Sequence, residues 1–238
     1  MILTKGSKVT LVIPDLQVPY EHKDALAFVD AVAEVFAPDE VVCIGDEVDQ
    51  MALSRFDPDP DGDGAGPELR KAIKKMQGWY RKFPDVKVCT SNHTGRVQKK
   101  AFHAGIPEAY MRDVNEWMEA PEGWEWRDSW EIDGVRYEHG DNQGGMYAAR
   151  NLAIRNRQST VIGHHHSHGA VFFIANDDET IFGMNTGCLI DIDAIAFKYA
   201  RGSAFKPTLG CGVVQYGVPL FVPMLLKKNK RWIGEVIV

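Results

Sequence analysis

Short apolar runs separated by helical spacing organise the first half of the chain. Over residues 21–36, apolar side chains recur every three or four positions, which predicts a helix that ends before Pro38. Apolar runs predict buried strands at residues 8–13, 41–44, 86–90 and 160–162. A strand, a helix and a second strand in succession form a βαβ unit, so the pattern predicts an α/β fold with parallel strands.

The remaining segments mix helical patterns with hairpins. Residues 124–130 lead into a hairpin whose turn is Asp133-Gly134, followed by a strand over residues 135–138. Three further segments have helical patterns: residues 68–82, 97–120 and 146–157. Four more runs predict strands: residues 171–175, 180–183, 212–216 and 220–226. The basic segment 227–231 predicts an exposed turn.

Residues 56–67 are dense in Asp, Pro and Gly, which predicts a mobile acidic surface loop near the mouth of any site. The spacing from Asp57 to Glu68 also fits an EF-hand calcium loop. Prolines at the second and fourth positions of that pattern argue against this alternative. The sequence has no internal repeat and no linker, so we expect one domain over residues 1–238.

Composition and charge narrow the class of partner. The net charge is −6, so the chain has no global basic field that would attract nucleic acid or an anionic membrane. Its four cysteines form no CxxC pair, which favours buried free thiols over disulfides or a zinc site. Residues 1–10 contain no signal-peptide core, and no apolar run approaches the ~18 residues that a membrane span needs. We therefore expect a cytoplasmic protein without a membrane partner.

Polar side chains follow five of the predicted strands at the point where each strand ends. In chain order these segments are Asp15-x-Gln17, Gly45-Asp46-x-x-Asp49, Asn92-His93, His139-Gly140 and Gly163-His164-x-His166. Ligands of open α/β sheets bind outside the carboxyl ends of the strands. Oxygen and nitrogen donors in this mixture suit Mn²⁺, Fe or Zn²⁺. Two cations that share one carboxylate would hold a phosphate and activate water.

This ordered series resembles the calcineurin-like metallophosphoesterase superfamily, whose motifs read D-x-H, G-D-x-x-D, G-N-H-[DE], a single H and G-H-x-H. The resemblance runs from Asp15 to His166 and implies a four-layer α/β/β/α sandwich with two mixed β-sheets. It implies one metal held by Asp15, Gln17, Asp46 and His166, and a second held by Asp46, Asn92, His139 and His164. Two divalent ions are expected, with Mn²⁺ preferred and Mg²⁺, Zn²⁺ or Fe as alternatives.

The resemblance also implies roles for residues beside the metals. His93 would protonate the leaving oxygen as a general acid, and Asp49 would keep His93 protonated and oriented. Arg96 and His165 are candidates for contacting the substrate, Arg96 as a phosphate clamp.

Some positions depart from the family pattern. Gln17 replaces the usual His, which would weaken the first metal site or favour Mn²⁺ or Mg²⁺. Ser91 stands in place of Gly, and Thr94 removes an acidic residue that would support the Asn92–His93 turn. Gln50 follows Asp49 where the protein Ser/Thr phosphatases carry Arg, which argues against that branch.

These observations predict a metal-dependent phosphoester hydrolase that prefers diesters. Nucleotides or nucleic acid are possible substrates, and no obligate protein partner is evident. One alternative is a phosphomonoesterase that acts on nucleotides or phosphoproteins. Another, from a different class, is a metal-binding scaffold that has lost catalysis, although the retained His93 and Asp49 pair argues against it.

Overall fold

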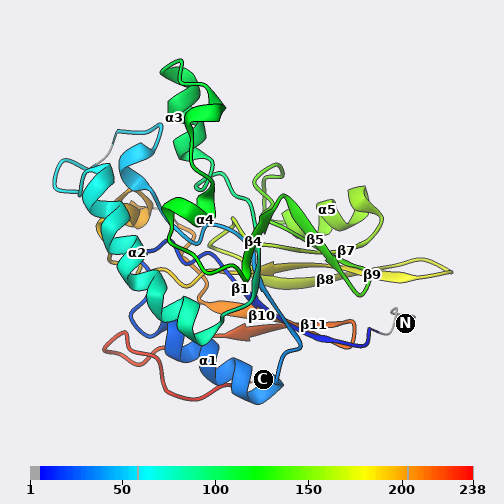
Figure 1. Cartoon of the computed structure of the whole chain (residues 1–238). Coiled ribbons are helices and arrows are strands. Elements are labelled where there is room, and N and C mark those ends of the chain that lie inside the picture. The colour runs from blue at the N-terminus through cyan, green and yellow to red at the C-terminus, as the bar shows by residue number, and fades with distance from the viewer. Residues whose placement is uncertain (1–5, 58, 203, 238) are drawn as a thin grey trace.

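Two β-sheets form the framework of the computed structural model (Figure 1), which describes residues 6–57, 59–202 and 204–237. Residues 1–5 of the chain lie outside the described residues, and so does Pro58 in the predicted acidic loop. The first sheet has six strands, in the order β11 (Val218–Pro223), β10 (Gly210–Gln215), β1 (Val9–Ile13), β2 (Glu40–Cys43), β3 (Val86–Cys89) and β4 (Trp124–Arg127). Strands β1 to β4 are parallel, and β10 and β11 add antiparallel pairs.

The second sheet has five strands and is also mixed. Its order is β5 (Ser129–Ile132), β6 (Val135–Glu138), β7 (Ser159–Ile162), β9 (Thr180–Thr186) and β8 (Gly169–Ala175). Strands β6, β7 and β9 are parallel, while β5 and β8 pair antiparallel at the two edges. The Asp133-Gly134 turn and the turn around Asp177 close the two predicted hairpins, which confirms both.

The inner faces of the two sheets pack against each other. Val12, Val42 and Ile44 of the first sheet share one buried cluster with Phe182 and Met184 of the second. These positions alternate with residues on the outer faces because side chains along a strand point to opposite sides of a sheet. The apolar runs of β1 and β2 are thus buried on both faces, as expected for central parallel strands.

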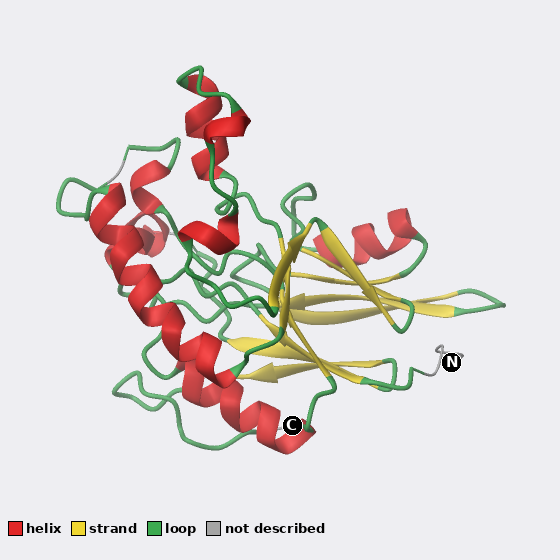
Figure 2. Cartoon of the chain, viewed as in Figure 1, coloured by secondary structure: helices red, strands yellow, loops and turns green. Residues whose placement is uncertain are grey.

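Helices cover the two outer faces (Figure 2). Helices α1 (Ala25–Phe36) and α2 (Ala65–Lys82) lie on the first sheet, where Phe28 and Trp79 join the cluster that contains Leu11. On the second sheet, α5 (Ala148–Asn156) packs through Leu152 against Ile162. The order helix, sheet, sheet, helix confirms the predicted four-layer α/β/β/α sandwich with two mixed sheets.

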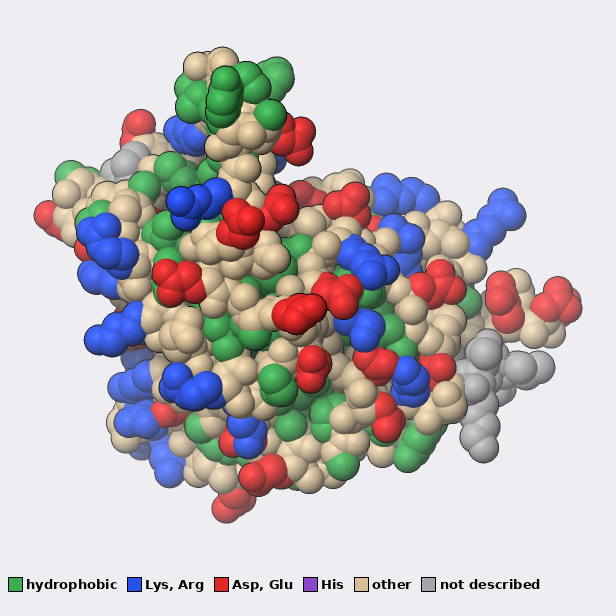
Figure 3. Space-filling model, in the orientation of Figure 1, with side chains coloured by type: hydrophobic (Ala, Val, Ile, Leu, Met, Phe, Trp, Pro, Cys, Tyr) green, Lys and Arg blue, Asp and Glu red, His purple; other side chains and the backbone are tan. Residues whose placement is uncertain are grey.

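The predicted helix over residues 97–120 is wrong in its extent. The segment forms α3 (Arg96–His103), the 3₁₀ turn η2 (Glu108–Tyr110) and the single-turn α4 (Val114–Trp117). Gly105 adopts φ +70° and Pro107 follows it, so the helix cannot continue past His103. The α3–η2 segment projects from the body, and apolar side chains gather at its tip, where Phe102 is 79% exposed (Figure 3).

Several other boundaries differ from the predictions, and two of them have a clear cause. Residues 124–130 are split between sheets, because the chain leaves the first sheet after Arg127 and enters the second at Ser129. Helix α2 begins at Ala65, three residues before the predicted start at Glu68. Pro67 is tolerated there because the first turn of a helix needs no intrahelical N–H donors.

The cysteines are all buried and unpaired, which confirms the predicted free thiols. Within the described ranges, the helices are too short or too polar to cross a membrane. A cytoplasmic location stays a prediction from the sequence.

Candidate metal centre

The strand ends of both sheets converge on one buried site. Strands β1, β2 and β3 are parallel neighbours, so the turns after them lie along the same edge of the first sheet. Strands β6 and β7 are likewise parallel neighbours in the second sheet. The structure places the polar residues that follow these strands within hydrogen-bonding reach of one another. From the first sheet come Asp15, Gln17, Asp46, Asn92 and His93, and from the second His139, His164 and His166.

Asp46 is the shared member of two groups that could hold a metal ion. Asp46, His139 and His164 offer ligand atoms within 4.8 Å of one another, and so do Asp15, Asp46 and His166. Asp46 is only 1% exposed. The structure therefore makes one carboxylate common to two neighbouring groups of possible metal ligands.

Unusual backbone conformations hold these side chains in place. Gln17, Asp46 and His164 have φ values of 54°, 49° and 63°, in the left-handed region that side chains rarely adopt. Such strain of ~1–3 kcal/mol per residue persists only where the surrounding structure imposes it, and it clusters at functional sites. Gly45 explains one tight approach, because a Cβ atom there would lie 2.8 Å from His139 Nδ1.

The first donor set contains several oxygen atoms without partners. His166 Nε2 lies 3.1 Å from Asp15 Oδ2, and Gln17 Nε2 donates to Asp46 Oδ2 at 2.8 Å. Both carboxylate oxygens of Asp15, Gln17 Oε1 and Asp46 Oδ1 are buried without a hydrogen bond. Half a turn of the Gln17 amide exchanges its nitrogen and oxygen and would direct Oε1 to the same space. Unpaired buried oxygens are costly, and a cation is a partner that satisfies them.

The second donor set is arranged around His139 Nε2. This atom lies 3.3 Å from Asp46 Oδ1, 3.1 Å from Asn92 Oδ1 and 3.3 Å from His164 Nδ1. His139 Nδ1 donates to the Ile44 carbonyl oxygen at 3.0 Å, which leaves Nε2 as the ligand atom. A ring nitrogen that donates to a backbone carbonyl is the usual outer support of a metal-binding imidazole.

The charges at the site explain its protonation. Burial alone would raise the pKa of Asp46, but His139 and His93 lower it well below its usual range. Burial would lower the pKa of His139, yet the Asp46 carboxylate outweighs it and raises this pKa to about 10. Burial and the neighbouring His139 lower the pKa of His164, which favours the neutral form that binds metals. A proton on His139 thus balances the carboxylates, and a bound cation would replace it.

The donors fit a divalent metal. Carboxylate and amide oxygens together with imidazole nitrogens suit Mn²⁺, Fe or Zn²⁺, and the unpaired buried oxygens face the same space. The residues that would hold the ions are Asp15, Gln17, Asp46 and His166 for one, and Asp46, Asn92, His139 and His164 for the other.

His93, Asp49 and Arg96 form a second layer beside Asp46. His93 Nδ1 lies 2.6 Å from the carbonyl oxygen of Asp49 and 3.1 Å from its carboxylate Oδ1. His93 Nε2 lies 3.7 Å from Asp46 Oδ2 and accepts from Arg96 Nη2 at 2.8 Å. Burial lowers the pKa of His93, but Asp46 and Asp49 outweigh both burial and Arg96, and the net shift is upward.

Arg96, a predicted phosphate clamp, already makes hydrogen bonds within the protein. Its Nη1 donates to the carbonyl oxygens of Asp49 at 2.6 Å and Gln50 at 3.1 Å. Because a guanidinium can only donate, His93 Nε2 must carry a lone pair while Arg96 contacts it. Arg96 therefore fixes the tautomer of His93, with the proton on Nδ1 directed at Asp49.

Glu47 belongs to this layer and was missed by the sequence predictions. It is fully buried, and its Oε1 accepts from Thr94 Oγ1 and from Trp126 Nε1, each at 3.2 Å. Thr94 also contacts Ser91 Oγ at 2.9 Å. Glu47, at the neighbouring strand end, thus supplies a carboxylate to the turn in which Thr94 replaces the acidic residue of the family pattern. An acidic residue directly after Asp46, at the end of an apolar strand, was the available signal.

Two other sequence-predicted features lie outside the donor sets. His165 Nε2 donates to the Gln143 carbonyl oxygen at 2.8 Å, and burial lowers its pKa, so its ring faces the loop before α5. Glu68 accepts from the backbone N–H groups of Met51 at 2.7 Å and Ala52 at 2.9 Å. These bonds support the 3₁₀ turn η1 (Met51–Leu53) and leave Glu68 unsuited to the EF-hand alternative.

Comparisons with known proteins give structural matches. Neither a search of protein-family models nor a search of curated proteins finds a match to this sequence. Vacuolar Protein Sorting 29 from Cryptosporidium parvum aligns with 96% of this chain and 94% of its own, at 15% identity and a TM-score of 0.47. Yfce, a phosphoesterase from E. coli, aligns with 96% of this chain and 98% of its own, at 13% identity and a TM-score of 0.43.

A third solved structure is the nuclease MPE from Pseudomonas putida. It aligns with 89% of this chain and 86% of its own, at 12% identity and a TM-score of 0.37. These are similarities of the backbone at low sequence identity. The proposals below rest on the side chains of this chain.

Proposed function

We propose that this protein is a metal-dependent phosphoester hydrolase with a dinuclear centre. The observation that carries the proposal is Asp46, a buried carboxylate common to two donor sets that contain buried oxygens without a hydrogen bond. Bound cations would neutralise the phosphate charge and lower the pKa of water, which produces a nucleophile at neutral pH. The protein's own part is to hold these donors in a fixed, dry arrangement.

His93 is proposed as the general acid for the leaving oxygen. It lies beside Asp46 without belonging to either donor set, and Asp49 orients it through Nδ1. Its Nε2 must release Arg96 before it can carry a proton. An anionic phosphoester offers Arg96 a new partner, so substrate binding would free Nε2 for protonation and hydrogen bonding to the leaving group.

We propose a phosphodiester as the preferred substrate. A diester carries one negative charge, whereas a monoester at neutral pH carries close to two. Arg96 is the cationic side chain that contacts His93, and it already donates to two backbone carbonyls. Because Nη1 is already engaged, Arg96 has few donors left for a phosphate, which suits the singly charged diester better than the monoester.

One observation favours a second candidate, a metal-binding scaffold without catalysis. The contact between Arg96 and His93 Nε2 holds the proposed acid in its unprotonated form. A scaffold would bind metal with the same residues and would show no turnover.

Turnover of two chromogenic esters tests the proposal. Bis-p-nitrophenyl phosphate and p-nitrophenyl phosphate are each assayed with Mn²⁺, Mg²⁺ or Zn²⁺, or with a chelator. We expect Mn²⁺-dependent hydrolysis that is faster for the diester. Faster monoester hydrolysis would support the monoesterase, and metal binding without turnover would support the scaffold. Equal rates with metal and with chelator would overturn the dinuclear mechanism.

A further inference from the structure

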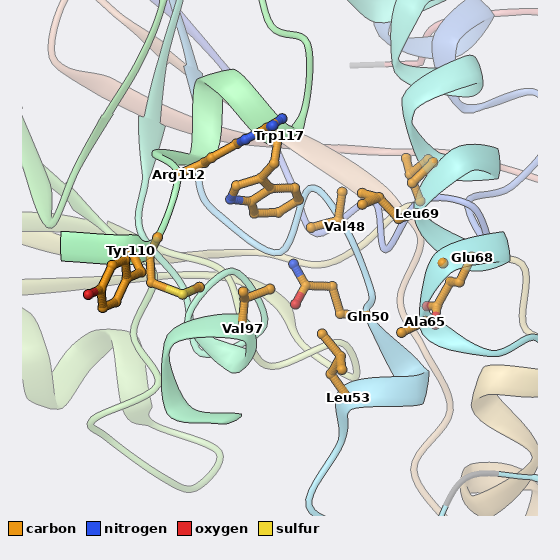
Figure 4. Close-up of a pocket in the computed structure, with 14 residues that line it drawn as sticks. Val48, Gln50, Leu53, Ala65, Glu68, Leu69, Val97, Tyr110, Arg112 and Trp117 are labelled. Carbon is orange, nitrogen blue, oxygen red and sulfur yellow. The ribbon is translucent and has the colours of Figure 1, made fainter. Parts of the chain in front are cut away.

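A cavity of about 370 Å³ lies beside the candidate metal centre (Figure 4). Its walls are mainly apolar and come from the turn after β2, the start of α2, the first turn of α3, and α4. Val48, Leu53, Leu69, Val97 and Trp117 line it. The volume and the apolar character are those of a pocket for a small organic molecule.

Two polar groups in the wall of this cavity have no partner. Gln50 is nine-tenths buried, and neither its Nε2 nor its Oε1 makes a hydrogen bond. Figure 4 shows its amide directed into the ring of lining residues, toward Val97 and Trp117. The indole Nε1 of Trp117 is also buried without a partner. Buried amide and indole groups are rarely left unpaired, so these atoms indicate a ligand with a polar edge.

The wall of this cavity adjoins the proposed catalytic layer. The backbone carbonyl of Gln50 accepts from Arg96 Nη1 at 3.1 Å, and Arg96 Nη2 lies 2.8 Å from His93 Nε2. Val97 in the cavity wall directly follows Arg96. Gln50 and Val97 therefore link this wall to Arg96, the side chain that contacts the proposed acid.

The chemistry of the walls defines the ligand class. Apolar side chains and an indole favour a flat aromatic ring. A Gln amide offers one donor and one acceptor side by side, which matches the adjacent amino group and ring nitrogen of adenine. An aliphatic substituent would fill the cavity but would leave Gln50 unpaired.

We propose that this cavity binds the base of a nucleotide phosphoester, with Gln50 reading the donor–acceptor edge of adenine and Trp117 contacting the ring. The proposal rests on the proposed function for its link to phosphoester chemistry. Contact with the base would give both amide atoms of Gln50 a hydrogen-bond partner, which they lack in the empty cavity.

Binding of adenosine, which has no phosphate, tests the cavity separately from the metal centre. The indole N–H signal of Trp117 is assigned by its loss in Trp117→Phe and followed by NMR in chelator. We expect adenosine to shift this signal and ribose 5-phosphate to leave it unchanged. Inosine, which lacks the amino donor, should bind about tenfold more weakly. An unchanged signal at saturating adenosine, or equal binding of inosine, would overturn the proposal.

Two variants extend the test. Gln50→Leu should abolish the preference for adenosine over inosine, so that the two bind about equally. Leu53→Trp should block binding by filling the cavity. Both should still bind Mn²⁺ with the wild-type stoichiometry, because neither residue belongs to a donor set. If neither the wild type nor any variant hydrolyses an ester, the proposed function is wrong. Adenosine binding still tests whether the cavity binds a base. Retained adenosine preference in Gln50→Leu would contradict the assigned role of Gln50.

Discussion

The two sheets bring different side chains to the candidate metal centre. The ends of β1, β2 and β3 provide carboxylates and amides together with His93, whereas the ends of β6 and β7 provide imidazoles. The residues from the first sheet include buried oxygens that make no hydrogen bond. The charge of the imidazoles from the second sheet depends on those carboxylates, as the raised pKa of His139 shows. Neither sheet alone contains a complete donor set.

This difference indicates that the site forms only when the sheets pack. Asp46 is held at low pKa by histidines that include His139 of the other sheet, and the pKa of His139 is raised in return. Gly163 permits the approach, because a Cβ there would lie 2.3 Å from Asp15 Oδ1. The seam between the sheets is therefore both the hydrophobic core and the support of the metal centre.

Replacing the shared carboxylate should have the largest effect. Asp46→Asn removes a ligand from both donor sets, so we expect loss of both metals and of turnover, measured by Mn²⁺ calorimetry and diester hydrolysis. The loss should exceed the ~10–100-fold cost of removing an outer support. Asp177→Asn, in the exposed β8–β9 turn, is the matched control and should behave as wild type. Unchanged Mn²⁺ stoichiometry in Asp46→Asn would contradict the shared ligand.

Removing the proposed acid should reduce turnover and spare the metals. For His93→Ala we expect kcat to fall ~10²–10⁴-fold, the usual contribution of general acid catalysis. The fall should be larger for alkyl leaving groups than for p-nitrophenol, because alkoxides need protonation more. The control is His103→Ala at the exposed end of α3. Equal losses with both leaving groups would argue against proton donation by His93.

Breaking the support from Glu47 should have an intermediate effect. Thr94→Val removes the hydroxyl that contacts Glu47 and Ser91, so the turn that carries Asn92 and His93 should loosen. We expect kcat/KM and Mn²⁺ affinity to fall ~10-fold or more, within the range for outer supports. Thr90→Val is the control, since the Thr90 hydroxyl donates to Asp128 and does not contact Glu47. A double-mutant cycle of Thr94→Val with Glu47→Gln should show non-additive losses. Additive losses would contradict the proposed coupling between Thr94 and Glu47.

The proton on His139 should make metal binding depend on pH. With its pKa raised to about 10, His139 is protonated in the metal-free protein at neutral pH and must lose this proton to bind metal. Mn²⁺ affinity should therefore rise with pH up to about 10, and calorimetry in buffers of different ionisation enthalpy should detect proton release. Binding without proton release at pH 7 would contradict His139 as a ligand.

The raised pKa of His139 also affects the stability of the metal-free protein. A raised pKa stabilises the folded state fully below the ordinary value of 6.5, and this contribution is lost as pH rises through about 10. Thermal unfolding in chelator should therefore show a falling Tm over this window. Saturating Mn²⁺ should remove that dependence.

Local sequence patterns predicted much of the framework. The apolar runs located the central strands, and the Asp133-Gly134 turn predicted the β5–β6 hairpin because its residues favour left-handed backbone. The same reasoning failed between residues 97 and 120, where Gly105 and Pro107 break the helix although the surrounding pattern is helical. It also failed at Arg127, because nothing local marks the point where a strand changes sheets.

The sequence by itself determined which chemical groups stand at the strand ends and in what order, since residue type and strand pattern are local properties. The tertiary structure alone decided that Glu47 accepts a hydrogen bond from Thr94, that Arg96 contacts His93 Nε2, and that Gln50 faces a cavity. Each of these depends on distances between segments far apart in the chain. Those distances are set by the packing of two sheets, which no local pattern encodes.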